Sequence, residues 1–192
     1  MHPLWHRDAV RKALAPMTEL ILFHHALGLT DGVHAFADDL RAAGHVVHVP
    51  DLFEGRSFSE IAEGVAYAEE VGFDTIVERG AAAAEELPDG IVYAGMSLGV
   101  MPAHALATMR QGARGALFLH ACVGPWASGL PLQVHLMADD DWAAEDLAVA
   151  RTLVGIELFI YPGDGHVFTD RGLPEYDERA AALVRERLLA FL

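Results

Sequence analysis

A serine lies between two glycines in the segment YAGMSLGVMP, residues 93–102, directly after an apolar run. A serine hydroxyl attacks a carbonyl carbon when a neighbouring base takes its proton, and a carboxylate commonly orients that base. Gly95 and Gly99 are typical of a sharp turn that presents Ser97 as a nucleophile, because larger side chains at these positions would collide there. The alternative is an ordinary glycine-serine loop that caps the helix expected directly after it.

A base for Ser97 has to come from the histidines that follow it. In hydrolases with this type of turn the chain order is serine, acid, histidine. His104 lies in an expected helix, His120 comes before the strand expected to lead to the acid, and His135 lies within that strand. Only His166 lies in a loop, YPGDGHVF (161–168), after the last expected strand. This loop contains two glycines that let it bend back over the sheet edge, as a base that reaches Ser97 requires. The alternative is that His166 is an ordinary histidine of an exposed loop.

The acid is expected in MADDDWAAED, residues 137–146, after the strand expected over 132–137. Asp139, Asp140 and Asp141 are all candidates, and the residues alone leave the assignment open. One or two of them are also expected to cap the helix that begins at residue 142, because negative charge is favourable at a helix N-terminus.

Short apolar or β-branched runs alternate with alanine-rich segments of helical period from residue 19 onward. This alternation predicts an α/β fold with a mostly parallel, doubly wound sheet of about six strands flanked by helices. Loops that follow the strands then meet at the carboxyl edge of the sheet, where ligands bind in such folds. The expected strands are 19–24, 45–50, 90–95, 115–120, 132–137 and 156–161, and the expected helices are 31–44, 59–70, 73–87, 100–112, 142–154 and 175–192.

Length and charge limit the classes of function. The 192 residues predict one domain over 18–192, preceded by an N-terminal extension over 1–17. A formal net charge of −15 argues against nucleic acid as a partner. No apolar stretch is long enough for a membrane span and the N-terminus lacks a secretion signal, so no membrane partner and a cytoplasmic location are expected. A monomer or small homo-oligomer is expected.

Four histidines near strand ends could in principle bind a metal: His24, His25, His48 and His120. The chain lacks an H-E-x-x-H motif, and its single cysteine, Cys122, excludes both a cysteine pair and an internal disulfide. Neither a metal nor another cofactor is therefore expected. His25 is instead expected at the mouth of the active site, and Cys122 as a small buried side chain.

Aromatic residues at the same edge are candidates for the wall of a substrate pocket. They are Phe53, Trp126, Trp142 and Phe168. The alternative is ordinary packing of loop aromatics against the ends of the sheet.

Five segments together resemble the dienelactone hydrolase family of α/β-hydrolases, in order and across nearly all of residues 19–192. They are LILFHHALGLT, HVVHVPDLFEGRSF, YAGMSLGVMPA, VHLMADDDWA and YPGDGHVFTD. The resemblance implies an α/β-hydrolase fold with Ser97 as nucleophile, His166 as base and Asp140 as acid, with Asp141 in reserve. It also implies an oxyanion hole formed by the backbone N–H groups of Leu98 and Ala26.

Three positions depart from the family pattern. Ser97 replaces the cysteine of the name-giving members, and His25 replaces a glutamate in the first loop. Asp170 stands where relatives have an arginine that holds a substrate carboxylate, and Arg171 follows it. These departures argue against dienelactone itself as the substrate and predict that Asp170 repels anionic substrates.

The residues and the resemblance predict a hydrolase that transfers the acyl group of a small ester or lactone to water through Ser97. A second reading within catalysis is a thioesterase or another acyl hydrolase with the same three residues. A reading from a different class is a non-catalytic binding protein that retains the fold.

Overall fold

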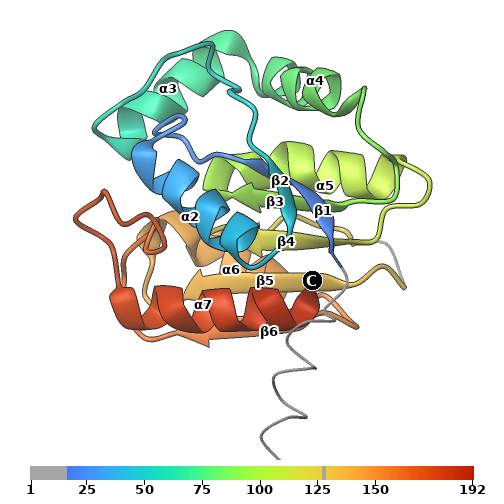
Figure 1. Cartoon of the computed structure of the whole chain (residues 1–192). Helices are drawn as coiled ribbons and strands as arrows, with labels where there is room; N and C mark the ends of the chain where they lie inside the picture. The colour runs from blue at the N-terminus through green and yellow to red at the C-terminus, as the bar shows by residue number, and fades with distance from the viewer. Residues whose placement is uncertain (1–16, 127–128) are drawn as a thin grey trace, which may run out of the picture.

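The structure is a computed structural model that describes residues 17–126 and 129–192. Its centre is a six-stranded sheet with the order β2-β1-β3-β4-β5-β6, in which every pair of neighbours is parallel. Helices cover both faces of this sheet (Figure 1). The strands are β1 Glu19–Phe23, β2 Val46–His48, β3 Val92–Met96, β4 Gly115–Leu119, β5 Leu132–Met137 and β6 Glu157–Tyr161. The predicted parallel α/β fold is confirmed.

The strand order reverses direction at β1. The chain runs from β1 outward to β2 and then returns to form β3 on the other side of β1, so that Leu20 pairs with both Val47 and Val92. The loops that follow β1 and β3 therefore start side by side at the carboxyl edge and lead to helices α2 (Asp31–Ala42) and α5 (Val100–Met109) on opposite faces of the sheet. In doubly wound sheets such a switch point is where ligands bind.

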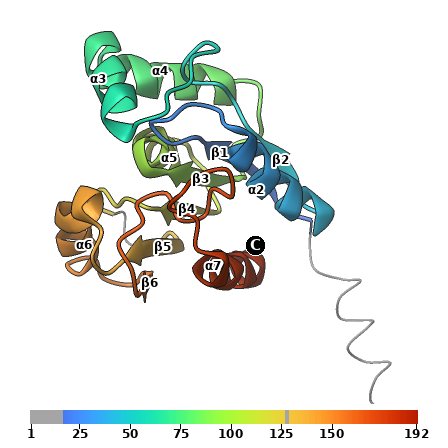
Figure 2. The same ribbon diagram turned by 90° about the vertical axis from the view of Figure 1, so that its left-hand side faces the viewer.

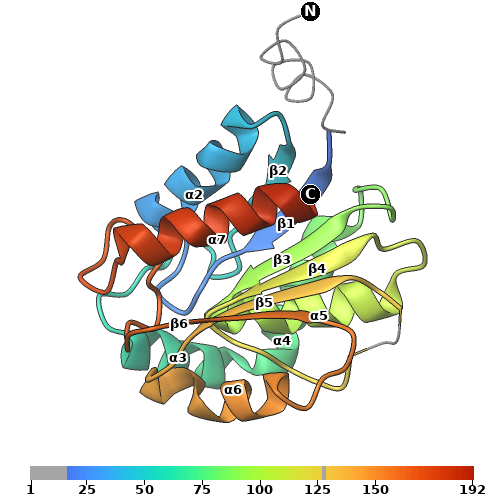
Figure 3. The same cartoon turned by 90° about the horizontal axis from the view of Figure 1, so that it is seen from below.

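Helices α2 (Asp31–Ala42) and α7 (Glu178–Phe191) cover one face of the sheet, as Figure 3 shows. Thr30 caps α2 by accepting a hydrogen bond from the backbone of Val33, and Asp177 caps α7 in the same way. The buried side chains recur every three or four residues, which places them on one face of each helix. They are Val33, Phe36, Ala37 and Leu40 in α2, and Ala180, Val184 and Leu188 in α7.

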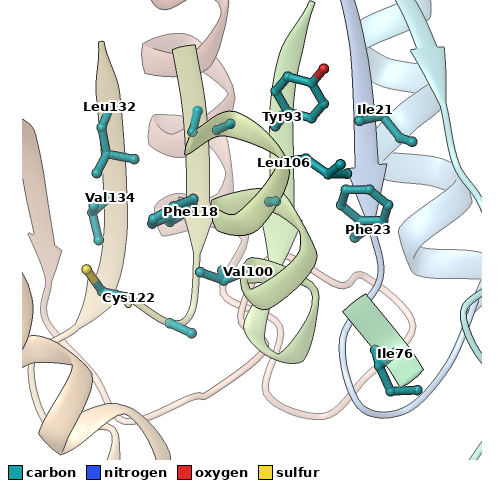
Figure 4. Packing of buried hydrophobic residues seen from close by; sticks show 14 of the residues in the cluster. Ile21, Phe23, Ile76, Tyr93, Val100, Leu106, Phe118, Cys122, Leu132 and Val134 are labelled. Atoms are coloured by element: carbon teal, nitrogen blue, oxygen red, sulfur yellow. The ribbon is translucent and has the colours of Figure 1, made fainter. Parts of the chain in front are cut away.

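Four helices lie on the opposite face: α3 (Ile61–Val71), α4 (Phe73–Ala84), α5 (Val100–Met109) and α6 (Ala144–Ala150). Figure 2, which looks onto the carboxyl ends of the strands, shows α5 and α6 across the sheet from α2 and α7. Phe23, Tyr93 and Phe118 project from the strands into this second core (Figure 4). Burial of each such side chain contributes about 1.5–3 kcal/mol, so the central strands form a rigid base for the loops above them.

The described elements differ from the sequence expectation mainly in length. β2 has three residues, and α6 is preceded by a short 3-10 helix, η2 (Asp141–Ala143). Another short 3-10 helix, η1 (Ser97–Gly99), joins β3 to α5. The prediction of an extension over residues 1–17 falls on the part outside the described residues, except for Met17. Within the described part, no helix combines the length and apolarity that a membrane span requires.

Candidate active site

Ser97 lies on a sharp turn between β3 and α5, with a backbone φ of +49°. Few residues other than glycine adopt this conformation, so the surrounding structure must hold it in place. A Cβ atom on Gly95 would overlap the carbonyl of Gly99, and a Cβ atom on Gly99 would overlap the carbonyl of Phe23 in β1. The two glycines therefore permit both the turn itself and its close packing against the end of β1.

A continuous chain of hydrogen bonds begins at the Ser97 hydroxyl. Its Oγ lies 2.7 Å from Nε2 of His166, and Nδ1 of His166 lies 2.7 Å from Oδ2 of Asp140. His166 and Asp140 are buried, whereas Ser97 is half-buried and so accessible to a ligand. An ionised Asp140 accepts the Nδ1 proton, which leaves the lone pair of Nε2 free to accept the Ser97 proton.

Of the three successive aspartates, Asp140 is the one that contacts His166. Its other oxygen accepts a hydrogen bond from the backbone N–H of Trp142 at 2.9 Å, so the same side chain caps η2. Asp141 is exposed and begins η2, and the backbone N–H of Asp139 donates to the carbonyl of Gly163. That last bond holds the acid loop against the loop that carries His166.

Leu98 and Ala26, which were expected to supply backbone N–H groups, lie on two loops that touch. Leu98 is the second residue of η1, and Gly99 in the same turn packs on the carbonyls of Phe23 and His24 at the end of β1. Ala26 follows two residues after His24 and is only 2% exposed. Within residues 17–126 and 129–192, the N–H of Ala26 donates no hydrogen bond.

The residues expected at the mouth and wall of a pocket occupy different environments. Trp142 is 53% exposed, and its ring centroid lies 6.2 Å from that of His166. Phe168 is buried, with its ring edge against His120. Phe53 and His25 are buried too, so Trp142 is the member of this set that reaches the surface beside His166. Their roles in a pocket stay predictions.

Asp170 is turned into the protein and not toward solvent. It is 1% exposed, and its carboxylate accepts hydrogen bonds from His25 Nε2 at 3.0 Å, Thr30 Oγ1 at 2.5 Å and Gly172 N at 2.8 Å. Burial alone would raise the pKa of Asp170, but these hydrogen bonds outweigh burial and lower it. The prediction that Asp170 repels anionic substrates is therefore wrong, because this carboxylate is buried and hydrogen bonds inside the protein already compensate its charge.

The Asp170 carboxylate also lies at the N-terminus of α2, where negative charge is favourable. A Cβ atom on Gly32 would overlap this carboxylate, so the glycine makes room for it. Asp170 thus ties the loop after β1 to the loop after β6, which carries His166. This role could not be predicted from the sequence, in which the only signal is the pair of departures from the family pattern at positions 25 and 170.

Three further histidines, His24, His120 and His135, are buried, and their pKa values are lowered. Burial lowers the pKa of His24 to about 4 and that of His135 to about 3, and it holds the pKa of His120 well below its usual value. His120 Nε2 lies 2.8 Å from Thr169 Oγ1, and its Nδ1 has no hydrogen-bond partner among the described residues. Across residues 17–126 and 129–192, no group of three or more histidine, cysteine, aspartate or glutamate side chains is arranged to hold a metal ion.

Cys122 follows β4 and is buried. Burial, together with the nearby Asp146 carboxylate, raises the pKa of its thiol to about 12. A thiol with this pKa is not ionised near neutral pH and is a poor nucleophile. The interpretation of Cys122 as a small packing residue agrees with its burial.

The parallel sheet, the turn after β3 and the loop order define an α/β-hydrolase fold. The chain belongs to the dienelactone hydrolase family, whose family model matches residues 9–192. A comparison with curated protein sequences gave no match.

Solved structures share the fold at low sequence identity. A putative dienelactone hydrolase from Klebsiella pneumoniae is 16% identical, with a TM-score of 0.70 over 92% of this chain and 87% of that one. A dienelactone hydrolase-like promiscuous phosphotriesterase from metagenomic libraries is 18% identical, with a TM-score of 0.69 over 92% and 86%. The thioesterase domain from the curacin biosynthetic pathway is 15% identical, with a TM-score of 0.64 over 91% of each chain.

Proposed function

We propose that this protein is a serine hydrolase that cleaves a small ester or lactone through an acyl-enzyme on Ser97. The observation that carries the proposal is the unbroken hydrogen-bond chain from Ser97 Oγ through His166 to Asp140. Each atom in this chain has the donor or acceptor character that nucleophilic attack requires. The strained backbone of Ser97 supports the same conclusion, since such strain is concentrated at functional sites.

Acylation begins when the Ser97 hydroxyl attacks the carbonyl carbon of the substrate. Nε2 of His166 takes the hydroxyl proton as the Oγ–C bond forms, and the carbonyl electrons move onto oxygen. Asp140 stabilises the imidazolium and keeps Nδ1 as a donor. When the tetrahedral intermediate collapses, the bond to the leaving-group oxygen breaks, and His166 returns the proton to that oxygen.

Negative charge on the carbonyl oxygen requires donors that are already in place. We assign this role to the backbone N–H groups of Leu98 and Ala26. Water then attacks the acyl-enzyme, with His166 again taking and returning a proton, and releases the acid. The proposed reaction needs no cofactor.

The proposal is tested by a hydrolysis screen with short and long p-nitrophenyl esters, simple lactones and acyl thioesters, each with wild-type protein and Ser97→Ala. Turnover of a neutral ester or lactone by wild type, reduced by at least about 10³-fold in Ser97→Ala, supports the proposal. Preferential turnover of thioesters would move the substrate class to thioesterase chemistry. Turnover that Ser97→Ala retains would contradict the proposal.

A further inference from the structure

His24 lies two residues before Ala26, whose N–H is a proposed oxyanion donor, and it has no exposed surface. Each nitrogen of its ring has one backbone partner: Nδ1 lies 2.8 Å from the carbonyl oxygen of His25, and Nε2 lies 2.9 Å from the backbone nitrogen of Leu52. The ring therefore links the loop after β1 to the loop after β2.

These two contacts define the protonation state of His24. The backbone N–H of Leu52 can only donate, so Nε2 must accept, and the carbonyl of His25 can only accept, so Nδ1 must carry the proton. Burial lowers the pKa of His24 to about 4, and this effect outweighs the Asp51 carboxylate 3.6 Å from Nε2. The neutral Nδ1–H tautomer is thus the form present near neutral pH.

The carbonyl that His24 holds belongs to the same peptide unit as the N–H of Ala26. That carbonyl also accepts a hydrogen bond from the backbone N–H of Gly28 at 3.1 Å. Because a trans peptide is planar, with its C=O and N–H pointing in opposite directions, fixing the carbonyl of His25 fixes the direction of the Ala26 N–H.

The N–H of Ala26 lies in a buried position without an acceptor among the described residues, which is typical of a donor that binds a ligand. Ala26 is 2% exposed, and its N–H has no acceptor within the described part of the chain, although backbone N–H groups in buried positions are nearly always paired. The carbonyl of Ala26 packs so closely on Gly64 of α3 that a Cβ atom there would overlap it. The peptide units on both sides of Ala26 are therefore held in place.

We propose that His24 is a positioning residue, which holds the His25–Ala26 peptide so that the Ala26 N–H points at the developing oxyanion. This inference rests on the proposed function, since it assigns a support to one of the two oxyanion donors. It also gives a physical role to residues 50–53, the PDLF part of the segment HVVHVPDLFEGRSF. Asp51 accepts hydrogen bonds from the backbone of Phe53 and Gly55, and the ring of Phe53 packs edge-on against His24 at 5.0 Å between centroids.

Two isosteric substitutions separate this role from simple packing. The side-chain amide nitrogen of asparagine takes nearly the place of Nδ1, so His24→Asn keeps the donor to the His25 carbonyl and loses the acceptor for Leu52. The side-chain amide of glutamine extends to the place of Nε2, so His24→Gln keeps an acceptor for Leu52 and loses the donor. His24→Asn leaves the N–H of Leu52 without its acceptor, whereas the His25 carbonyl in His24→Gln keeps the N–H of Gly28 as a donor. A larger loss of activity in His24→Gln would therefore not come from an unpaired buried backbone group.

We expect kcat/KM for a neutral p-nitrophenyl ester to fall about 10–100-fold in His24→Gln, mostly through kcat, and less than about threefold in His24→Asn. The inhibition constant of a trifluoromethyl ketone, which forms a tetrahedral adduct on Ser97, should rise in parallel with the loss of kcat/KM. The inhibition constant of the product acid should stay within about twofold, because it forms no such adduct.

A spectroscopic measurement on the wild-type protein keeps the inference testable if a variant does not fold. Nitrogen-15 NMR of the ring should show His24 protonated on Nδ1 at neutral pH. Protonation on Nε2, or equal losses in the two variants, would overturn the inference while Ser97-dependent turnover still stands. Absence of both turnover and adduct in wild type would instead overturn the proposed function, and this inference with it.

Discussion

The position of one proton on His166 decides whether Ser97 can act as a nucleophile. Asp140 accepts the Nδ1–H of His166 with one oxygen and the backbone N–H of Trp142 with the other. Both oxygens are therefore occupied, and the carboxylate cannot rotate without losing a hydrogen bond. This arrangement keeps Nε2 of His166 as the acceptor that faces Ser97.

Replacing Asp140 should expose this dependence directly. Asp140→Asn presents an amide that can donate to Nδ1, which favours the wrong tautomer and should lower kcat by about 10³–10⁴. Asp141→Asn, one residue along and exposed, should lower kcat by less than about tenfold. Steady-state kinetics with a neutral ester measure both effects, and the reverse ranking would move the acid to Asp141.

Asp170 should contribute to stability and not to substrate choice. Its pKa is lowered from 3.8, so the ionised form is favoured in the folded state. Its stabilisation is then fully present above about pH 4 and is lost as the pH falls through the folded pKa. Asp170→Asn should therefore lower the free energy of unfolding by about 1–3 kcal/mol at pH 7.

Urea unfolding from pH 7 downward, to the lowest pH at which both proteins fold, measures this contribution. The difference between wild type and Asp170→Asn should shrink as the pH falls below the usual range for aspartate. Asp164→Asn is the matched control, because Asp164 is exposed in the same loop. A difference between wild type and Asp170→Asn that grows at low pH would contradict the account.

Residues with a local signature could be predicted from the sequence. Glycines mark the turn around Ser97, and a glycine-containing loop after the last strand marks His166. Asp140 required the family resemblance, because three successive aspartates are locally equivalent. Contacts that join distant segments were beyond prediction: His25 meets Asp170 145 residues away, and His24 meets Leu52 28 residues away.

At the scale of elements, the site is an intersection of four loops at the carboxyl edge of the sheet. The loops after β1 and β3 approach each other because Gly99 has no side chain between the turn and the carbonyls of Phe23 and His24. The loops after β5 and β6 are joined by the hydrogen bond from Asp139 N to Gly163 O. Strand order thus brings residues 26, 97, 140 and 166 into one region.

Gly99→Ala tests the close approach of η1 to β1. Its added Cβ would meet backbone atoms, which cannot move aside as a flexible side chain can, so we expect a loss of about 1–3 kcal/mol in the free energy of unfolding and reduced turnover. Gly90→Ala is the control, because Gly90 is exposed and the atom nearest to a new Cβ, the carbonyl oxygen of Gly112, would be 3.8 Å away. Chemical unfolding that ranks the two variants equally would contradict this explanation.

Element types and order were predictable because apolar periodicity is a local property. All six strands were predicted within a few residues, and the helices began and ended close to their expected bounds. Helix α6 (Ala144–Ala150) is shorter at both ends than its periodic segment over 142–154. At the N-terminal end, Asp140 caps the 3-10 turn η2 through the N–H of Trp142, and apolar periodicity does not distinguish such a turn from the first turn of an α-helix.

At the scale of the whole molecule, the dominant electrostatic property is the formal net charge of −15. A negative field lowers the local concentration of anionic substrates at every approach to the site, and salt screens this effect. We therefore still predict a preference for neutral esters, and we expect its cause to be the total charge and not Asp170.

The salt dependence of turnover separates these causes. For an ester that carries a carboxylate, kcat/KM should rise a few-fold when ionic strength increases from about 0.01 M to about 0.15 M, as the Debye length falls from about 30 Å to about 8 Å. The uncharged analogue should change little. A higher kcat/KM for the anionic ester than for its uncharged analogue, with a difference that becomes smaller as salt is added, would instead indicate a cationic binding group such as Arg171 or Arg56.

The most direct test of the account is the mass of the protein after reaction with a serine-reactive fluorophosphonate. We predict one adduct per chain, located by peptide mapping on Ser97, and no adduct in Ser97→Ala. Labelling should also slow strongly in His166→Ala, because the base that activates the hydroxyl is gone. An unlabelled wild-type protein, or an adduct on another serine, would contradict the assignment of Ser97 as the nucleophile.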